Sequence, residues 1–307
     1  MRVLELGTPP APVEIEGGGA FEVLAVALNP LDLAVCTGRY FGGHPPVPYV
    51  PGAEAIGLLD GERSYLFGEG FGTVRDGFLV ERVDFPPESA VPVPADLDDA
   101  RAAACGIAGL AGWVPIAHKA RVEPRDRVLV LAATGMVGSV AVQAARLLGA
   151  ERVVAAGRDP ERLERARELG ADETVRLAGD GLAARFREAC GGEGPTVVVD
   201  PLWGEPARAA VQAAAPGARI VQVGQSAGPE ASLASADIRG RQLVILGHTN
   251  FRLSHDERSR AYAELADHVA SGHIRIDVET FPLERIGEAW ATQQQGTKAV
   301  VVVRPGP

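Results

Sequence analysis

The stretch Ala132-Ala133-Thr134-Gly135-Met136-Val137-Gly138 decides the fold, because it follows an apolar run at residues 127–131 and opens a helical pattern. A buried strand, a tight turn and a helix in this order are typical of a dinucleotide-binding unit. Gly135 would let the backbone approach a pyrophosphate, and Gly138 would let the helix pack close to the strand. The first helical turn offers N–H groups to the phosphates. Ala132 replaces the usual first glycine, and an ordinary tight turn is the alternative interpretation.

The tip of the next predicted strand, residues 152–156, indicates which dinucleotide is bound. An acidic residue about 20 positions beyond the glycines usually binds the ribose of a cofactor that lacks a 2′-phosphate. Here the chain reads Gly157-Arg158, and a guanidinium binds a phosphate with two parallel hydrogen bonds, so the pattern favours NADPH. Arg176, after the third predicted strand, is expected to assist. Asp159 leaves two alternatives open: it turns back to the ribose, or Arg158, Asp159 and Pro160 only begin the next helix.

The region around this turn alternates between strand and helix patterns. Apolar strand runs lie at residues 127–131, 152–156, 196–199, 219–223 and 242–246, and helical stretches lie at 137–148, 160–169, 182–190, 205–214 and 254–270. This alternation predicts an α/β fold with a doubly wound parallel sheet that is covered on both faces.

The flanking regions have a different pattern. Residues 2–94 show short alternating runs broken by Gly and Pro, including runs at 21–28 and 77–83, which predict antiparallel β structure. One hairpin is expected at Asp60-Gly61, between strands at 55–59 and 64–67. The proline-rich stretch 29–52 is interpreted as a rigid loop region, residues 99–119 as an alanine-rich helical segment, and residues 274–303 as short strands around one helix near 283–293.

Length, charge and cysteine content exclude several classes of protein. A chain of 307 residues exceeds the usual size of one hydrophobic core, so we expect two domains. A net charge of -10, with no lysine or arginine block, makes nucleic acid a poor partner. No run reaches the roughly 18 apolar residues that a membrane span needs. Because Cys36, Cys105 and Cys190 are scattered and the N-terminus lacks a secretory pattern, we expect a cytoplasmic protein with reduced thiols, without nucleic-acid or membrane partners.

Taken together, the residues resemble the medium-chain dehydrogenase/reductase superfamily, in its zinc-independent quinone oxidoreductase branch of zeta-crystallin-like proteins. The resemblance covers nearly the whole chain and rests on Asn29-Pro30-Leu31-Asp32, Gly38-Arg39-Tyr40, Pro51-Gly52-Ala53-Glu54, residues 109–113, the turn at 132–138, Val223-Gly224 and Gly296-Thr297-Lys298. It implies a GroES-like β domain formed by both chain ends (residues 1–112 and 254–307) and a Rossmann NADP-binding domain (residues 113–253), with the site in the cleft between them.

The resemblance also allows zinc dependence to be tested residue by residue. Zinc-dependent relatives place a thiolate or an imidazole where this chain has Asp32, and a histidine where it has Ala53. Neither substitute restores a tetrahedral catalytic site, and three scattered cysteines do not form a structural one. No metal is therefore expected, and Glu54, which resembles a residue near the metal in those relatives, is expected to be a structural hydrogen-bonding carboxylate.

Without a metal to polarise a simple ketone, a conjugated acceptor is the favoured substrate. The expected function is NADPH-dependent hydride transfer to a quinone or an α,β-unsaturated carbonyl compound, a small molecule. Tyr40 matches a position where neighbouring enoyl thioester reductases use a tyrosine as proton donor, so it is the candidate catalytic and substrate-binding residue; a ring that only packs on the proline-rich loop is the alternative. Asn29 is the second candidate substrate-binding residue, or an ordinary turn former.

Two further loops are expected to contact the cofactor. One ends the strand at 219–223 and the other follows the strand at 242–246, and their candidate residues are Gly224, Gln225, Ser226, His248, Thr249 and Asn250. Two alternative functions remain open: an enoyl thioester reductase, and a non-catalytic NADPH-binding protein of the crystallin or regulatory type. The family resemblance also implies a homodimer, with the strand at 242–246 pairing across a two-fold axis.

Overall fold

The computed structural model describes residues 1–13 and 18–304. The chain divides into two compact units. Unit 1 contains residues 1–108, 253–272 and 276–307, and unit 2 contains residues 109–252 and 273–275. The first division falls a few residues before the boundary that the sequence indicated at residue 112.

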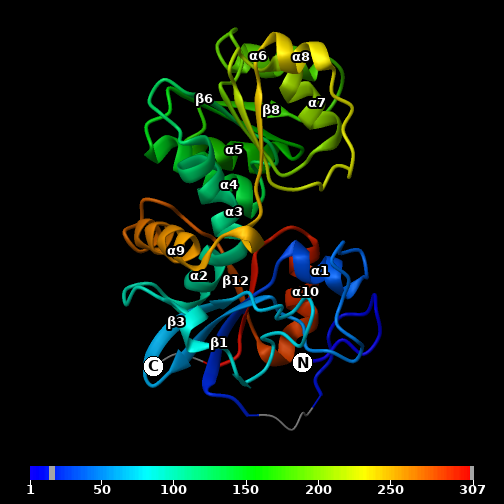
Figure 1. The fold of residues 1–307 in the computed structure, drawn as a ribbon, viewed down its shortest axis with the longest axis vertical. Coiled ribbons are helices and arrows are strands. Elements are labelled where there is room, and N and C mark those ends of the chain that lie inside the picture. The colour runs from blue at the N-terminus through cyan, green and yellow to red at the C-terminus, as the bar shows by residue number, and fades with distance from the viewer. Residues whose placement is uncertain (14–17, 305–307) are drawn as a thin grey trace. The chain divides into compact units, whose positions relative to one another are not determined.

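Unit 2 is built on a six-stranded parallel sheet with the order β11-β10-β9-β6-β7-β8. Its strands are β6 (Arg127–Val130), β7 (Arg152–Gly157), β8 (Glu173–Arg176), β9 (Val197–Asp200), β10 (Arg219–Gln222) and β11 (Val244–Gly247). The helices after α3 (Leu110–Val114) are α4 (Met136–Leu147), α5 (Pro160–Glu168), α6 (Leu182–Ala189), α7 (Gly204–Ala213) and α8 (Ser235–Gly240), several of which are visible around the sheet in Figure 1. The predicted α/β class with a doubly wound sheet is confirmed.

The strand order of unit 2 reverses between β6 and β9. From β6 the chain adds β7 and then β8 on one side, and from β9 it adds β10 and then β11 on the other. In open parallel sheets, ligands bind outside the carboxyl ends of the strands at this kind of switch point. The fold therefore places the turn at 132–138, which follows β6, beside the switch point.

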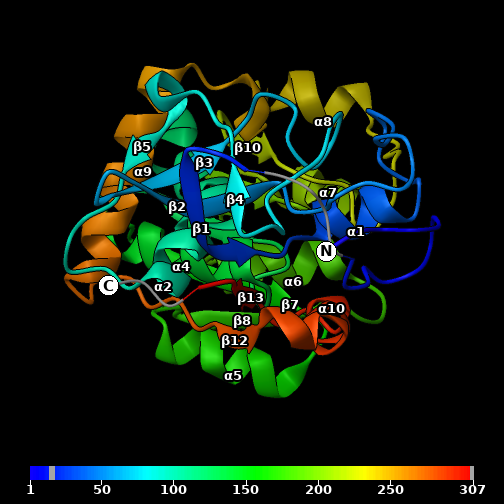
Figure 2. The same cartoon turned by 90° about the horizontal axis from the view of Figure 1, so that it is seen from below.

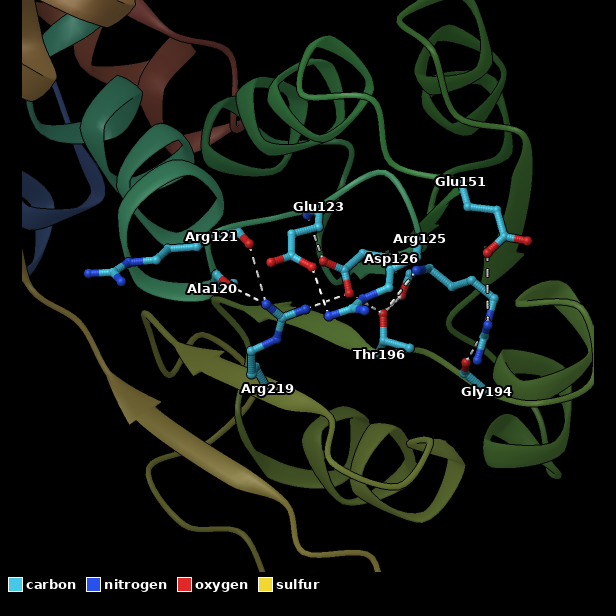
Figure 3. Close-up of polar contacts among 10 residues, drawn as sticks. Ala120, Arg121, Glu123, Arg125, Asp126, Glu151, Gly194, Thr196 and Arg219 are labelled. Atoms are coloured by element: carbon cyan, nitrogen blue, oxygen red, sulfur yellow. Dashed lines mark hydrogen bonds and ion pairs between the residues drawn. The ribbon is translucent and has the colours of Figure 1, made fainter.

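The opposite, amino-terminal ends of the same strands are tied together by a polar network centred on Asp126 (Figure 3). Its Oδ1 accepts hydrogen bonds from the Thr196 hydroxyl (2.7 Å) and from Arg219 Nη2 (2.5 Å), and its Oδ2 accepts one from the Glu123 N–H (2.8 Å). Arg219 also donates to the Ala120 carbonyl (2.5 Å). Burial raises the pKa of Asp126, but these hydrogen bonds outweigh burial and lower the pKa below its ordinary value.

Unit 1 is built on a seven-stranded mixed sheet with the order β12-β13-β1-β2-β3-β5, and β4 also pairs with β1. The strands are β1 (Phe21–Ala27), β2 (Glu54–Leu59), β3 (Glu62–Phe67), β4 (Arg82–Val83), β5 (Val91–Pro92), β12 (Glu279–Pro282) and β13 (Ala299–Val302), and Figure 2 shows β1 to β4 side by side. Its helices are α1 (Pro30–Cys36), α2 (Asp99–Ala104), α9 (His255–Ala270) and α10 (Ile286–Gln294). Residues from both chain ends therefore share one sheet, because β1 pairs with β13.

Three short segments differ from the sequence-based expectation. The stretch 29–52 is not only loop, because α1 begins at Pro30, a residue whose fixed φ suits the first position of a helix. The run at 77–83 forms a strand only at Arg82–Val83, since its earlier residues hydrogen-bond to the loop at 50–52. Helix α8 was not anticipated.

The hairpin at Asp60-Gly61 agrees with the prediction: β2 and β3 pair from Glu54 with Phe67 to Leu59 with Glu62.

One helical stretch in the described part of the chain, Asp99–Ala120, is long and apolar enough to cross a membrane by composition alone. It is 72% buried inside the protein, as expected of a core helix. Its backbone is interrupted at Gly106, where ψ is -119°. A side chain at Gly106 would overlap Glu54, because a Cβ there would lie 2.0 Å from Glu54 Oε2.

Candidate functional site

The turn after β6 has the geometry of a phosphate-binding loop. Helix α4 begins after Gly135, and no described side chain caps its first turn, so the first N–H groups remain available to an anion. A Cβ at Gly138 would lie 2.4 Å from the Ala132 carbonyl oxygen, so only glycine lets the helix approach the turn this closely. A Cβ at Gly135 would meet no atom nearer than 3.7 Å, so the space above Gly135 is open. Thr134, Gly135, Met136 and Val137 are all partly exposed, and the turn fits a dinucleotide pyrophosphate.

Ala132, at the usual first glycine position, has a φ of 49°. This left-handed conformation is the reason that glycine is the common residue there, and alanine tolerates it at some cost.

The tip of β7 presents a basic residue beside the turn. A Cβ at Gly157 would lie 2.6 Å from Thr134 Cγ2, which shows how closely β7 approaches the turn. Arg158 is exposed and lines a shallow hollow of about 680 Å³ together with Asp159, Pro160 and Glu161. Asp159 is the N-cap of α5, where its Oδ1 accepts hydrogen bonds from the Glu161 N–H (2.9 Å) and the Arg162 N–H (3.2 Å). The carboxylate at this tip is therefore engaged by its own helix, and Arg158 is available to a ligand.

The remaining cofactor candidates follow the neighbouring strands. Arg176 is the last residue of β8 rather than a residue after it, and its side chain is exposed. The loop after β10 packs on the loop after β9: Ser226 Oγ donates to the Pro201 carbonyl (3.2 Å), and a Cβ at Gly224 would lie 2.8 Å from the same oxygen. Gln225 and Ser226 are exposed.

The loop after β11 contains one buried polar pair. His248 Nε2 and Asn250 Oδ1 lie 2.9 Å apart, and both residues are buried. Burial lowers the pKa of His248 to about 4 although the hydrogen bond to Asn250 acts in the opposite direction. His248 is thus neutral at pH 7 and holds the loop, whereas Thr249 between the two is exposed.

In unit 1, Tyr40 lies in the loop after α1. Its side chain is half-buried, its ring packs at 4.7 Å from the Phe41 ring, and no described residue hydrogen-bonds to its hydroxyl. A Cβ at Gly42 would lie 2.6 Å from Tyr40 Cε1, so the absence of a side chain at Gly42 leaves room for the Tyr40 ring. The phenol of Tyr40 is protonated at neutral pH, and burial raises its pKa further. The Tyr40 hydroxyl is therefore a donor with no internal acceptor among the described residues.

Asn29 belongs to a buried network with Glu54 and Lys298. Its Nδ2 donates to Glu54 Oε1 (2.7 Å) and its Oδ1 accepts from Lys298 Nζ (2.8 Å). Glu54 Oε2 accepts from the Tyr65 hydroxyl (2.9 Å) and from the Ile107 N–H (2.5 Å). The Asn29 amide is fully engaged inside unit 1, so its role as a substrate ligand stays a prediction.

Two acidic groups and one lysine carry the charge of this network. The side chains of Lys298 and Glu54 are 3% and 0% exposed, and Lys298 Nζ lies 3.6 Å from Glu54 Oε1. Burial raises the pKa of Glu54 and lowers that of Lys298, and each opposes the shift of the other. Asp32 accepts from the Asn29 N–H (2.7 Å) and the Ala53 N–H (3.0 Å), and burial raises its pKa to about 6.

The expected structural role of Glu54 agrees with this network, in which both of its oxygens accept hydrogen bonds. Among residues 1–13 and 18–304, no group of three or more His, Cys, Asp or Glu side chains is arranged to hold a metal ion. Asp32, at the position of a metal ligand in zinc-dependent relatives, uses its two oxygens to bind backbone N–H groups.

Sequence reasoning missed two residues that stand out in the structure of unit 2. Asp200, at the end of β9, is fully buried, and Trp203, just after it, has a φ of 58° and a ψ of -160°. The only signal available in the sequence was a tryptophan directly before a glycine at a strand-to-helix turn.

Comparisons with known proteins agree with this architecture. The family model "Zinc-binding dehydrogenase" matches residues 137–270. The chain is 31% identical over 304 residues to a phenolphthiocerol/phthiocerol polyketide synthase polypeptide of Mycobacterium tuberculosis, an alignment that covers 92% of this chain but 13% of that relative. It is 26% identical over 322 residues to the quinone oxidoreductase of Lama guanicoe, which covers 99% of this chain and 96% of the relative.

Two solved structures are similar over nearly the whole chain. The quinone oxidoreductase of Thermus thermophilus, whose complex with NADPH is also known, superposes with a TM-score of 0.76 at 29% identity, covering 98% of this chain and 99% of that chain. An NAD-dependent alcohol dehydrogenase superposes with a TM-score of 0.82 at 28% identity, covering 99% and 100%. The expected resemblance is confirmed. The comparisons support the medium-chain dehydrogenase/reductase superfamily, in its quinone oxidoreductase-like branch, as the family that this chain resembles.

Proposed function

We propose that the protein is an NADPH-dependent reductase that delivers a hydride to a quinone or an α,β-unsaturated carbonyl compound. The reaction consumes NADPH, one proton and the acceptor, and yields NADP⁺ and the two-electron-reduced acceptor. The similarity to the quinone oxidoreductases of Lama guanicoe and Thermus thermophilus supports the acceptor class.

The observation that carries the choice of NADPH is the tip of β7. An exposed Arg158 lines the hollow there, and Asp159 is occupied as the N-cap of α5. A free carboxylate at this position would repel a 2′-phosphate, whereas a guanidinium binds it. Arg176, exposed at the end of the adjacent strand β8, adds a second positive charge at the same edge of the sheet.

The residues of the chain have separate tasks in this proposal. The first turn of α4 binds the pyrophosphate through its N–H groups, and Arg158 with Arg176 binds the 2′-phosphate. The loops after β10 and β11, at residues 224–226 and 248–250, line the other half of the dinucleotide. When bound, NADPH would supply the hydride.

Tyr40 provides the proton or stabilises the developing charge on the acceptor oxygen. Its hydroxyl is protonated at neutral pH, and it does not hydrogen-bond to any described internal acceptor. A conjugated acceptor needs only such a donor, since the added charge is spread from carbon to oxygen.

A turnover screen tests the proposal. NADPH and NADH oxidation, followed at the absorbance of the reduced nicotinamide, is compared across quinones, enones and enoyl thioesters. We expect turnover of a quinone or an enone with a preference for NADPH, and Tyr40→Phe is expected to reduce turnover by about 10-fold or more while NADPH affinity is unchanged. Saturable NADPH binding without turnover of any acceptor would instead support the non-catalytic alternative.

An enoyl thioester reductase is the second candidate, favoured by the similarity to a polyketide synthase. Polyketide chains grow from acyl units, so an acyl thioester is the corresponding acceptor. The same screen separates the two candidates, because the thioester would then be reduced with a higher kcat/KM than any quinone or simple enone.

We further propose a homodimer in which β11 of two copies pair. β11 is an edge strand of the sheet in unit 2, and it exposes Val244 (44%) and Ile245 (37%). An exposed apolar edge strand is a surface that proteins normally cover. Light scattering after size exclusion tests the proposal, and a monomer mass would refute it; Ile245→Lys is expected to convert a dimer into monomers.

A further inference from the structure

The loop after β9 contains an unusual backbone conformation at Trp203. Its φ of 58° and ψ of -160° fall in a region that is almost restricted to glycine. Five other non-glycine residues in the described chain have a positive φ, at 49° to 52°, and four of them are polar or charged residues. A bulky aromatic residue in this conformation is an outlier that the surrounding structure must impose.

The surrounding structure does impose it. Asp200 Oδ1 accepts hydrogen bonds from the Leu202 N–H and the Trp203 N–H, each at 2.9 Å. The Ala227 N–H donates to the Leu202 carbonyl (2.8 Å), so the loop after β10 holds the same turn from the other side. Trp203 is therefore fixed from both directions, with Asp200 as the positioning residue.

The turn that holds Trp203 also leaves one buried polar atom without a hydrogen bond. Asp200 is fully buried, and its Oδ2 has no hydrogen-bond partner among the described residues. A buried carboxylate oxygen without a partner is unfavourable, and strain and unpaired polar groups that occur together in native structures are typical of functional sites.

Trp203 is only partly buried. Its neighbour Leu202 packs against the core cluster of unit 2 that includes Leu129, Val198 and Ile220, and Trp203 is not among the described residues of that cluster. The backbone of a large aromatic residue is thus fixed where part of the residue is exposed to a ligand.

The topology indicates which ligand this is. β9 lies next to β6 across the switch point, so the loop at 201–204 faces the crevice from the side opposite β7 and β8. In the proposed function, the 2′-phosphate half of the dinucleotide lies over β7 and β8, where Arg158 and Arg176 are found. The nicotinamide half extends over β9 and β10.

Resting on that proposed function, we infer that Trp203 contacts the nicotinamide ring of the bound dinucleotide. The indole provides an aromatic surface for the ring, and Asp200 holds the strained backbone that presents it. Trp203 is thereby a cofactor-binding residue of the loop after β9.

Four variants of the 307-residue chain and two ligands test this assignment. The ligands are NADPH and 2′-phospho-ADP-ribose, which lacks only the nicotinamide ring, and their dissociation constants are measured by calorimetry. Trp203→Phe keeps an aromatic ring, Trp203→Ala removes it and keeps the strain, and Trp203→Gly removes both. Gln242→Gly is the matched control, because it relaxes a residue with a φ of 52° at a different loop of unit 2.

We expect Trp203→Ala and Trp203→Gly to weaken NADPH binding about 5-fold, the effect of one lost aromatic contact, and to leave 2′-phospho-ADP-ribose binding unchanged. Trp203→Phe and Gln242→Gly should bind both ligands within about 2-fold of the wild type. Trp203→Gly should also melt at a higher temperature than Trp203→Ala, because glycine relieves the strain.

If the wild type binds NADPH, and Trp203→Ala and Trp203→Gly bind it equally well, the inference is overturned and the proposed function is not. Equal weakening of both ligands would also overturn it, since Trp203 would then act on the whole loop and not on the nicotinamide ring. A wild-type protein that binds neither ligand would overturn the proposed function itself, together with the inference.

Discussion

The distance and burial of the pair Lys298 and Glu54 predict how much folding stability is lost when the lysine is removed. Lys298→Met leaves the Glu54 carboxylate fully buried without its counter-ion, which at 3.6 Å contributes about 5 kcal/mol of Coulomb attraction in a medium of effective dielectric constant 20. The folded variant avoids part of this loss if Glu54 takes up a proton. Protonating a glutamate of ordinary pKa about 4.3 costs about 3.7 kcal/mol at pH 7. We therefore expect the variant to be destabilised by about 3 to 4 kcal/mol at pH 7.

This mechanism gives the variant a characteristic pH dependence. In the variant the folded pKa of Glu54 lies above its unfolded value, so folding takes up a proton, and stability is gained as the pH falls and lost as it rises. The stability of the variant should rise by up to about 1.4 kcal/mol for each pH unit that the pH falls between about 7 and 5, and the wild type, in which Lys298 opposes the raised pKa of Glu54, should gain less. A purely steric defect would show no such trend.

A double-mutant cycle separates the ion pair from its surroundings. Glu54→Gln alone leaves Lys298 as the unpaired group, whereas Lys298→Met combined with Glu54→Gln leaves no buried charge in the pair. The double variant should be more stable than the sum of the two single effects by at least about 2 kcal/mol.

The assay is urea unfolding followed by the fluorescence of Trp290, a buried residue of unit 1. Trp113 and Trp203, which belong to unit 2, are replaced by phenylalanine in all variants so that the signal reports unit 1. A coupling energy below about 0.5 kcal/mol, or a destabilisation that does not change between pH 7 and 5, would refute the reasoning.

Three other variants probe unit 2. Arg158→Ser should weaken NADPH binding about 10- to 100-fold and change NADH binding little, as measured by titration of reduced nicotinamide fluorescence; equal losses for both cofactors would contradict the 2′-phosphate assignment. Gly138→Ala places a Cβ 2.4 Å from the Ala132 carbonyl oxygen, so thermal unfolding should show a loss of about 2 kcal/mol together with weaker NADPH binding, and an unchanged melting temperature would argue against the close approach. Asp126→Asn should cost about 2 kcal/mol at pH 7 in urea unfolding. Because the folded pKa of Asp126 lies below its unfolded value, its contribution is complete above about pH 4 and disappears as the pH falls through the folded pKa, so the difference from the wild type should narrow at acidic pH.

The parallel sheet was predictable because its central strands are short, mostly apolar runs between clear turn residues. β6 and β9 are buried almost throughout, and their predicted ranges agree with the structure within a residue or so at each end. Helix α1 was missed because prolines around it were interpreted as loop signals, although Asn29 followed by Pro30 is also a helix start. β8 (Glu173–Arg176) contains charged residues and has little apolar pattern to detect.

The site was predictable where it depends on local backbone geometry. The turn at 132–138 and the basic tip at Arg158 are each readable from a few neighbouring residues. The network of Asn29, Glu54 and Lys298 was not, because it joins residues 25 and 269 positions apart in the chain. The strained turn at Trp203 was not predictable either, because a residue's type does not state which backbone angles a buried carboxylate such as Asp200 will impose on it.

The Asp126 network and the glycine turn lie at opposite ends of the same strand, β6. The Asp126 network holds the strands together at the amino-terminal end, and the turn at 132–138, after the carboxyl end, is the proposed pyrophosphate-binding site. Variation at Asp126, Thr196 or Arg219 would then alter how much of the protein survives proteolysis and heat in a cell, without changing which cofactor it selects. The two properties are open to independent adjustment, by selection or by engineering.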